Sequence, residues 1–429
     1  MAEPVIIPRS DHPISRQNID ADALKVLYRL RQFNHIAYLV GGSVRDLLVG
    51  RTPKDFDIGT SAHPYQVKRL FRNCWIIGRR FRLAHVKFGP KIIEVATFRR
   101  QVPAGTEEEP VAVVPVHPPP GESAEDLDLL IHHDNTFGTP EEDAFRRDFT
   151  LNALFYDIET RSIIDYVGGL EDIRAGVIRC IGIPEERFQE DPVRMLRAIA
   201  LGARLDFAID PPVLDAIGRY HGELARSAPA RLMEEIYKVL RAGAAEKAFH
   251  MLADTGLLAA IAPEVPGRIT PMFWQSLAAI DGYRRAFKRN PEALGNAILM
   301  GSLLIPLGLL DQQHGRTKDL GARFGILPLA RRDVEFLRHI LMLQRHLRDP
   351  NASLRHKRAI VHRSAFPAAL IWLELHGSAP DVVASWRALQ AEMVEQMPEG
   401  LPASDAAPRH RRRRRRRRRF PTPGHHGPM

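Results

Sequence analysis

Residues 38–60 read YLVGGSVRDLLVGRTPKDFDIGT, and this segment decides the fold at the start of the chain. An apolar run ends at Gly41 and Gly42, and the residues from Ser43 to Val49 have the apolar spacing of a helix. Lys54–Gly59 then predicts a short strand. A strand, a glycine turn, a helix and a second strand are typical of an α/β unit built on a small sheet.

The glycine pair has a second use besides turning the chain. Gly41 and Gly42 let the backbone approach a bound anion, and they stand where the next helix begins. The amide groups and the dipole at the N-terminus of a helix favour phosphate. A lone Gly-Gly pair is more often only a turn, so this interpretation depends on the acidic residues that follow.

Those acidic residues predict a metal site. Asp55 and Asp57 stand two residues apart, and such side chains point to the same face of a strand, where they repel unless a cation lies between them. Oxygen ligands of this kind suit Mg²⁺, which also binds triphosphate oxygens. Glu94, within the apolar run at 92–96, is predicted to be an inward-facing third ligand or a support for one. The alternatives are a solvated strand edge for the aspartates and an arginine partner for Glu94.

This arrangement predicts two-metal catalysis by Asp55, Asp57 and Glu94, with Asp55 and Asp57 holding two Mg²⁺ ions. In such a site one ion lowers the pKa of an attacking hydroxyl and the other stabilises the leaving oxygen.

Composition and periodicity divide the chain into parts and predict an α+β fold. The residues at 102–134 are rich in proline and acids and cannot bury much apolar surface. From about residue 191 to residue 397 the helical period dominates. The predicted parts are a mobile N-terminal arm (1–20), a mixed-sheet head (21–158) with a flexible insertion (102–134), an all-helical neck (159–242) and body (243–399), and a disordered arginine-rich tail (400–429).

The charge of the chain is concentrated at its end. The net charge is +10, and residues 401–429 hold ten arginines and one aspartate, so the rest of the chain is close to neutral. Nine adjacent arginines attract phosphates without sequence preference, which predicts RNA binding by Arg411, Arg412, Arg413, Arg414 and Arg415. Two cysteines exclude a disulfide framework, and no apolar run has the length of a signal peptide or a membrane span, so a cytoplasmic location is expected.

As a set, these motifs resemble a known family. Gly41-Gly42-x-x-Arg45-Asp46 with Asp55-x-Asp57 is similar to the signature of the class II nucleotidyltransferases of the polymerase β superfamily, which comprise bacterial poly(A) polymerases and tRNA CCA-adding enzymes. Further segments agree in the order of the family: RRD at 146–148, DYVGGLED at 165–172, EDPVR at 190–194, and a helix with Arg231, Glu234, Glu235 and Lys238. The resemblance covers roughly residues 38–263. It implies that the neck (159–242) recognises the nucleotide base and binds RNA, and that the body (243–399) binds RNA.

The resemblance implies a nucleotide site. Its members would be Gly41, Gly42, Arg45, Arg147, Asp148, Asp191, Arg194 and Arg197. Asp148 is expected beside the incoming ribose. Asp191 and Arg194 are predicted to lie one turn apart on one helix face, where a carboxylate and a guanidinium can meet the Watson–Crick edge of a base without a template. Taken alone, the same two residues would suit a capping acid with an ion pair.

Two segments favour one branch of the family. GRRFRLAHV at 78–86 and DNTFG at 134–138 resemble segments of bacterial poly(A) polymerases. The predicted reaction is therefore transfer of AMP from ATP to RNA 3′ ends, which promotes RNA processing or decay. A tRNA nucleotidyltransferase that adds CCA is the first alternative, and a catalytically inactive RNA-binding protein is the second. ATP and RNA 3′ ends are the expected partners, and the sequence identifies no protein partner in RNA decay or RNA chaperoning.

Overall fold

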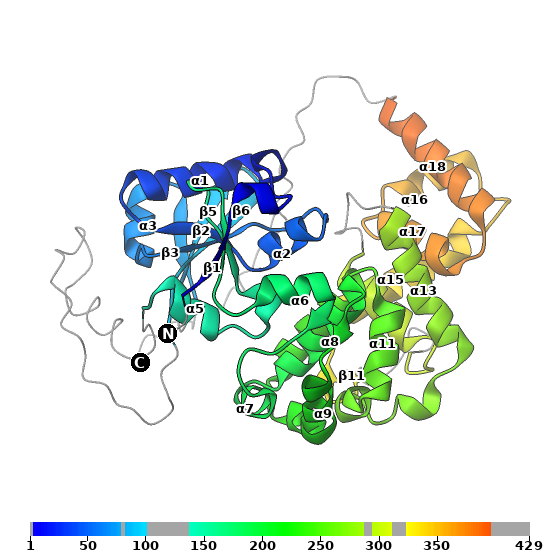
Figure 1. Cartoon of the computed structure of the whole chain (residues 1–429). Coiled ribbons are helices and arrows are strands. Elements are labelled where there is room, and N and C mark those ends of the chain that lie inside the picture. Colours follow the sequence, from blue (N-terminus) through cyan, green and yellow to red (C-terminus); the bar gives the residue numbers. More distant parts are fainter. Residues whose placement is uncertain (1–2, 79–81, 101–136, 287–293, 311–322, 396–429) are drawn as a thin grey trace, which may run out of the picture.

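The computed structural model describes residues 3–78, 82–100, 137–286, 294–310 and 323–395. In these residues a sheet-containing head is followed by a helical part (Figure 1). The insertion predicted at 102–134 and the tail predicted at 400–429 lie outside the described residues, as do Arg411 to Arg415. The α+β class predicted from the sequence is confirmed.

The head is built on one mixed sheet of eight strands in the order β1-β8-β7-β2-β3-β6-β5-β4. Within it β3 and β6 are parallel, and the other neighbours are antiparallel. The strands are β1 (Val5–Ile7), β2 (Ala37–Val40), β3 (Asp57–Thr60), β4 (Cys74–Ile77), β5 (Leu83–Phe88), β6 (Lys91–Thr97), β7 (Leu154–Tyr156) and β8 (Ile163–Asp165).

Helices cover this sheet and then continue alone. The helices that accompany the strands are α1 (Ala21–Gln32), α2 (Gly42–Leu48), α3 (Pro64–Leu70), α5 (Pro140–Phe145) and α6 (Gly169–Ala175). The later helices are α7 (Pro184–Glu190), α8 (Val193–Leu205), α9 (Pro211–Tyr220), α10 (Pro229–Arg241), α11 (Ala245–Asp254), α12 (Leu257–Ile261), α13 (Pro271–Ala286), α14 (Asn296–Leu304), α15 (Arg331–Leu347), α16 (Leu354–Val361), α17 (Phe366–His376) and α18 (Pro380–Glu395). No helix in the described ranges is both long and apolar enough to cross a membrane.

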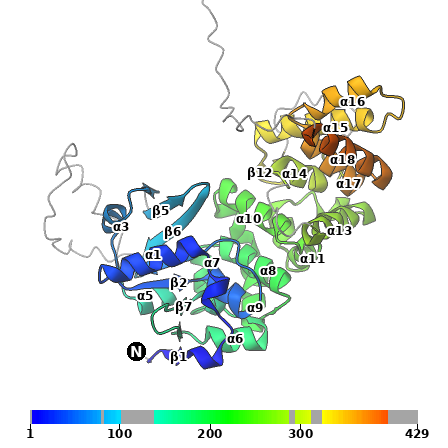
Figure 2. The ribbon, with the colours of Figure 1, turned by 90° about the horizontal axis from the view of Figure 1, so that it is seen from above.

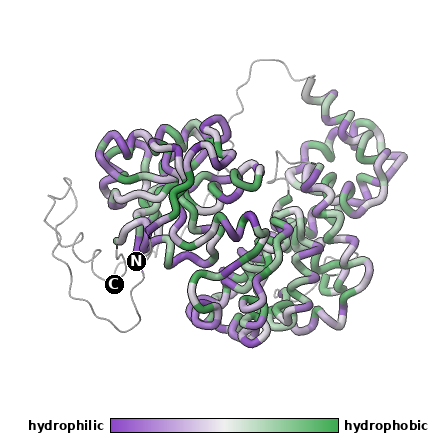
Figure 3. Tube along the Cα trace, viewed as in Figure 1, coloured by the Kyte–Doolittle hydropathy of each residue, from purple (hydrophilic) through white to green (hydrophobic). Residues whose placement is uncertain are grey.

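Local sequence explains the elements that support the site. Asp20 caps α1, because its Oδ1 accepts hydrogen bonds from the amides of Asp22 (2.9 Å) and Ala23 (3.3 Å). The strands at the centre of the head are hydrophobic, and its outer turns are hydrophilic (Figure 3). Gly59 in β3 has no room for a side chain, since a Cβ there would lie 2.6 Å from the Phe98 ring and 2.9 Å from Val40. The sheet therefore packs closely directly behind the predicted carboxylates.

The expectation of a mobile arm at residues 1–20 is wrong for residues 3–20. Val5–Ile7 forms strand β1 at the edge of the sheet (Figure 2), and this strand pairs with β8. Ile7, Ile14 and Ile19 are buried in the core of the head. The segment is rich in prolines and polar residues, so its composition predicted no core residues. Its isolated isoleucines are buried by segments far along the chain, and local composition does not predict such contacts.

The head also extends beyond residue 158, where the boundary with the neck was predicted. Strand β8 belongs to the sheet of the head, and Leu170 of α6 lies in the same core. The later part, predicted to be all helical, contains two short strand pairs. These are β9 (Val177–Ile178) with β10 (Ala208–Ile209), and β11 (Arg323–Phe324) with β12 (Leu327–Pro328). Strands of two residues are too short to leave a periodic signal.

The packing of the N-terminal segment can be tested with a matched pair of variants. Ile14 is fully buried, whereas Ile6 is 62% exposed. Ile14→Ala should lower the free energy of unfolding by about 2–4 kcal/mol, and Ile6→Ala by less than about 1 kcal/mol. Urea unfolding of both variants measures the difference. Equal, small effects would mean that residues 3–20 do not belong to the core.

Candidate active site

The glycine turn holds an arginine against the start of α2. Gly41 has a φ of +68°, a conformation that favours glycine, and a Cβ there would lie 3.0 Å from Nη1 of Arg147. Arg147 donates to the carbonyl of Asn152 (3.0 Å) and to Oδ2 of Asp143 (2.8 Å), and its guanidinium lies over the Phe155 ring. The structure thus brings together two predicted members of the nucleotide site, Gly41 and Arg147.

The two aspartates occupy different local structures. Asp57 is the first residue of β3, but Asp55 lies in the loop before the strand, with its side chain 72% exposed. The prediction that both lie on one strand is therefore wrong, although the two carboxylates remain close enough to repel. Burial first, then Glu94 and Asp55, raise the pKa of Asp57 to about 6, against an opposing effect of Arg147.

Glu94 lies beside Asp57 but is not inward-facing. The register pairs Ile58 of β3 with Val95 of β6, so the residues preceding each are neighbours in the sheet. The Glu94 side chain is 50% exposed, and its Oε1 lies 3.6 Å from Nε2 of His85. Its immediate neighbours, Ile93 and Val95, are buried on the other face of the strand, so the apolar sequence around Glu94 suggested a burial that its own face does not have.

The donor set fits a divalent cation. Asp57 has no ion pair with a cationic side chain in the described part of the chain, while Glu94 and Asp55 raise its pKa. A hard cation would remove this repulsion, and carboxylate oxygens are the ligands that Mg²⁺ prefers. No group of three or more acidic, histidine or cysteine side chains in the described residues is arranged to hold a metal alone, so triphosphate oxygens would have to complete the coordination.

Arg45, predicted to bind nucleotide, is instead buried inside the head. Its Nε and Nη2 donate to Oδ1 of Asp46 (2.9 and 2.7 Å), and its Nη1 donates to Oδ1 of Asn152. Burial lowers the pKa of Arg45, and the carboxylate of Asp46 opposes that shift. A guanidinium whose donors are bound to protein in this way orders its neighbours rather than a ligand.

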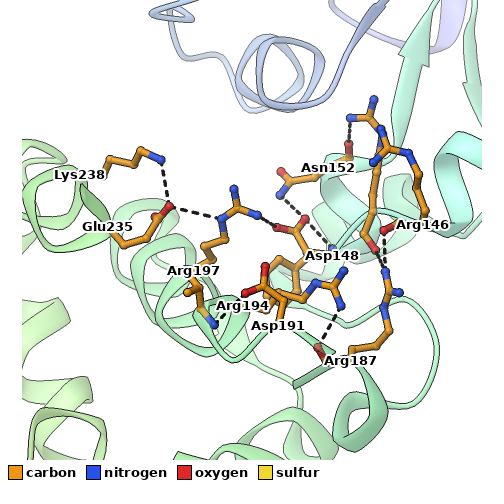
Figure 4. A network of polar contacts seen from close by, with 12 residues as sticks. Arg146, Asp148, Asn152, Arg187, Asp191, Arg194, Arg197, Glu235 and Lys238 are labelled. Carbon is orange, nitrogen blue, oxygen red and sulfur yellow. Dashed lines mark hydrogen bonds and ion pairs between the residues drawn. The ribbon is translucent and has the colours of Figure 1, made fainter. Parts of the chain in front are cut away.

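From this arginine a closed ring of polar contacts runs to helix α8. Asn152 donates from Nδ2 to Oδ1 of Asp148 (3.0 Å), and Asp148 accepts from Nη1 of Arg197 at its Oδ2 (3.2 Å; Figure 4). On the other side, Nη2 of Arg204 donates to Oδ2 of Asp46. Arg197 and Arg204 are seven residues apart on α8 and therefore share a face. The ring fixes α8, the first long helix after the head, against α2 and against the loop that carries Asp148.

A second branch leads from this ring to α10. Nε of Arg197 lies 3.6 Å from Oε1 of Glu235, which also accepts from Nζ of Lys238 (2.9 Å; Figure 4). Glu235 and Lys238 lie on α10, the helix of the last family-like motif in the sequence. Helix α10 therefore supports the guanidinium of Arg197. We call the contacts among Arg45, Asp46, Asp148, Asn152, Arg197 and Arg204 the head–neck ring.

The predicted base-reading pair does not lie on one helix. Asp191 ends α7, and α8 begins at Val193, so Asp191 stands at the junction with Arg194 in the first turn of α8. Asp191 accepts from Nη2 of Arg231 (2.8 Å), and Arg194 donates to Oε2 of Glu190 (2.9 Å). The proline at 192 favours an extended residue before it, which explains the interrupted helix.

Arg187 is a supporting residue that the sequence did not single out. Its Nη2 donates to the carbonyls of Arg146 and Arg147 (2.6 Å each), so it joins α7 to the segment that carries Asp148 (Figure 4). Asn152 and Arg204 were missed as well. Asn152 lies in FTLNALFY, directly after the RRD motif, and that position was the available signal. For Arg204 and Arg187 only long-range contacts reveal the role.

Comparison with known proteins identifies this arrangement. Two protein-family models match the sequence. The family model described as the poly A polymerase head domain matches residues 37–179, and the family model described as a probable RNA and SrmB-binding site of polymerase A matches residues 206–267. Residues 37–179 are therefore similar to the poly A polymerase head domain. Poly(A) polymerase I of Salmonella typhi is 49% identical over 260 residues, which make up 61% of this chain and 54% of that protein. The chain thus spans about half the length of the curated relatives it matches.

The CCA-adding branch is also similar. A CCA-adding enzyme of Lactobacillus johnsonii is 35% identical over 245 residues, 57% of this chain and 55% of that enzyme. The crystal structure of the Bacillus stearothermophilus CCA-adding enzyme in complex with CTP has a TM-score of 0.60 and 27% identity, covering 87% of this chain and 83% of that one. The described chain therefore shares its fold, a head followed by a helical part, with this CCA-adding enzyme.

The carboxylate repulsion predicts how Asp57 affects stability. Because the pKa of Asp57 is raised to about 6, the folded protein takes up a proton between about pH 6 and pH 4 that the unfolded chain does not. Metal-free Asp57→Asn should therefore be more stable than wild type above pH 6, by about 1 kcal/mol since the side chain is partly exposed. This advantage should fade as the pH falls to 4.

Thermal unfolding with and without Mg²⁺ measures the effect. Magnesium should raise the Tm of the wild type and leave that of Asp57→Asn nearly unchanged. An equal rise in both proteins would exclude Asp57 as a ligand. Glu264→Gln, a change of an acid far from the carboxylates in sequence, serves as the charge-matched control and should keep the full magnesium response.

Proposed function

We propose that the protein is a template-independent RNA nucleotidyltransferase that adds AMP from ATP to RNA 3′ ends. The observation that carries this proposal is the Asp57 carboxylate, which has a raised pKa beside Asp55 and Glu94 and forms no ion pair in the described residues. It lies next to the glycine turn of a head that is similar to the poly A polymerase head domain. The 49% identity to Poly(A) polymerase I favours adenylate as the product. The proposal extends to a role in RNA processing or decay in the cytoplasm.

The proposed catalytic site would bind two metal ions and the triphosphate through different residues. Asp55 and Asp57 would hold two Mg²⁺ ions, with Glu94 beside them. When bound, the ions supply a lowered pKa for the RNA 3′-hydroxyl and charge stabilisation for the triphosphate. The amides at Gly41 and Gly42 would face phosphate oxygens at the start of α2. Catalysis then depends mainly on how accurately the protein positions the two substrates.

Base selection would rest on the junction between α7 and α8. Asp191 and Arg194 are there, each held by one ion pair that a nucleotide could displace or share. Asp148 would contact the ribose. Hydrogen bonds from Asn152 and Arg197 orient its carboxylate. Since α8 carries both Arg194 and Arg197, the head–neck ring would align base recognition with the metal-binding carboxylates.

Two alternative functions, CCA addition to tRNA and RNA binding without catalysis, can be tested by the same assay of nucleotide addition. The likeness to the CCA-adding enzyme in complex with CTP favours the first alternative, addition of CCA to tRNA. The second alternative, an inactive RNA-binding protein, is disfavoured because Asp55, Asp57, Asp148, Asp191 and Arg194 are all present. Poly(A) polymerase I is the better sequence match, so ATP alone should suffice.

Nucleotide choice tests the proposal. With Mg²⁺ and a generic single-stranded RNA, the protein should add many residues with ATP alone and few with CTP alone. Asp57→Asn should reduce addition by at least about a thousandfold, because one metal ligand is removed. Extension of a tRNA that lacks CCA, with each nucleotide offered separately, measures both branches. A requirement for CTP followed by ATP on tRNA only would favour the CCA-adding function, and no addition to either RNA would favour the inactive protein.

A further inference from the structure

A cluster of cations occupies the corner where α15 ends and α16 begins. It consists of Arg345, His346, Arg355, His356, Lys357 and Arg363, and we call it the basic corner. The His346 and His356 rings lie 5.7 Å apart, which brings the two helices together at this point. Helices α15 and α16 lie at the end of the molecule away from the sheet of the head (Figures 1 and 2).

No ion pair within the described part of the chain neutralises the arginines and the lysine of the basic corner. Arg345, Arg355 and Arg363 are exposed, and within the described ranges neither they nor Lys357 form an ion pair. Neighbouring arginines do find partners, since Arg358 lies 3.5 Å from Glu392. Most exposed charges that serve only solubility are interspersed with charges of the opposite sign. Here the nearby acid is Asp349, whose Oδ1 accepts from the amide of Asn351.

The stability of the helices does not explain these cations. Ser353 caps α16, and the first turn that follows contains Arg355, His356 and Lys357 and no acid. Cations at the N-terminus of a helix oppose its dipole, so they cost stability there. The pKa of His346 is lowered by its burial first and then by Arg345, Arg363 and His356. The cluster is therefore a region of concentrated positive potential, which the positive end of α16 strengthens.

We propose that the basic corner binds the phosphate backbone of the RNA substrate. This inference rests on the proposed function, because it takes RNA to be the substrate. It adds a contact surface outside residues 206–267, the part that matches the RNA-binding family model. Arginine forks match phosphate oxygens, and several of them on one surface bind a polyanion without reading its sequence.

RNA fits this surface better than a protein partner does. Protein interfaces are anchored by buried aromatic or aliphatic side chains, with charged residues confined to the rim. The exposed large apolar side chains at the basic corner are Leu354 and Met342, which lies one turn before Arg345 on α15, and both stand among cations that a protein interface would keep at its rim. RNA bound here would follow a path away from the head, so long RNAs would reach a surface that a short 3′ end does not.

The test uses two triple variants of the full chain with equal changes in charge. The first removes the basic corner by Arg345→Gln, Arg355→Gln and Arg363→Gln. The control removes three arginines from β11 and the opposite end of α15, by Arg323→Gln, Arg331→Gln and Arg332→Gln. Binding of a 30-nucleotide single-stranded RNA is measured without ATP or Mg²⁺ over a series of salt concentrations.

The basic-corner variant should bind RNA about tenfold more weakly, and the slope of log K against log salt should fall by about 2, at ~0.7 for each phosphate that the protein no longer neutralises. The control should keep the wild-type slope. Arg355→Gln alone, which removes a cation from the positive end of α16, should keep the fold and lower the slope by about 0.7. Unchanged slopes in the basic-corner variants, or an equal fall in the control, would overturn the inference.

Nucleotide addition separates this inference from the proposed function. A protein that adds no nucleotide to any RNA contradicts the proposed function, while the binding assay still decides whether the basic corner contacts RNA. Conversely, normal adenylation with unchanged salt slopes would overturn only the inference. For an active protein, removal of the basic corner should raise the KM for long RNA more than that for a short oligonucleotide.

Discussion

The structure depends on the ion pair between Asp46 and Arg204. Asp46 ends the glycine motif in the head, and Arg204 lies near the end of α8 in the helical part. Asp46 is buried and also receives two hydrogen bonds from Arg45, so its carboxylate is neutralised on both sides. Removal of Arg204 would leave Asp46 with Arg45 alone, and the loss of one partner from a buried charge network costs up to about 3–5 kcal/mol. The ion pair therefore ties the fold of the head to the position of the neck.

The rest of the head–neck ring turns this attachment into a defined geometry. Arg197, two turns before Arg204, meets Asp148, and Asn152 links Asp148 back to Arg45. Two contacts on one helix face fix its rotation as well as its distance. A nucleotide between the carboxylates of the head and the start of α8 would thus meet groups that are already oriented, which lowers the cost of positioning it.

The sequence predicted the elements of the head well, because each depended on local signals. The glycine turn and the apolar spacing around it placed α2 and β3 within a few residues. Contacts between distant segments were not visible, so Arg45 was taken for a ligand and Arg204 was missed. Glu94 was expected to be buried because its sequence neighbours are apolar, although alternate residues of a strand face opposite sides. Residues 3–20 were misjudged for the same reason, since their isoleucines are buried by partners far along the chain.

A double-mutant cycle between Asp46 and Arg204 most directly tests whether this ion pair couples the head to the neck. The free energies of unfolding would be compared for the wild type, Asp46→Asn, Arg204→Met and the double variant. A coupling energy of about 1–3 kcal/mol is expected, with the double variant less destabilised than the sum of the single ones. Effects that add to within about 0.5 kcal/mol would contradict the coupling, because the two residues would then stabilise the head and the neck independently.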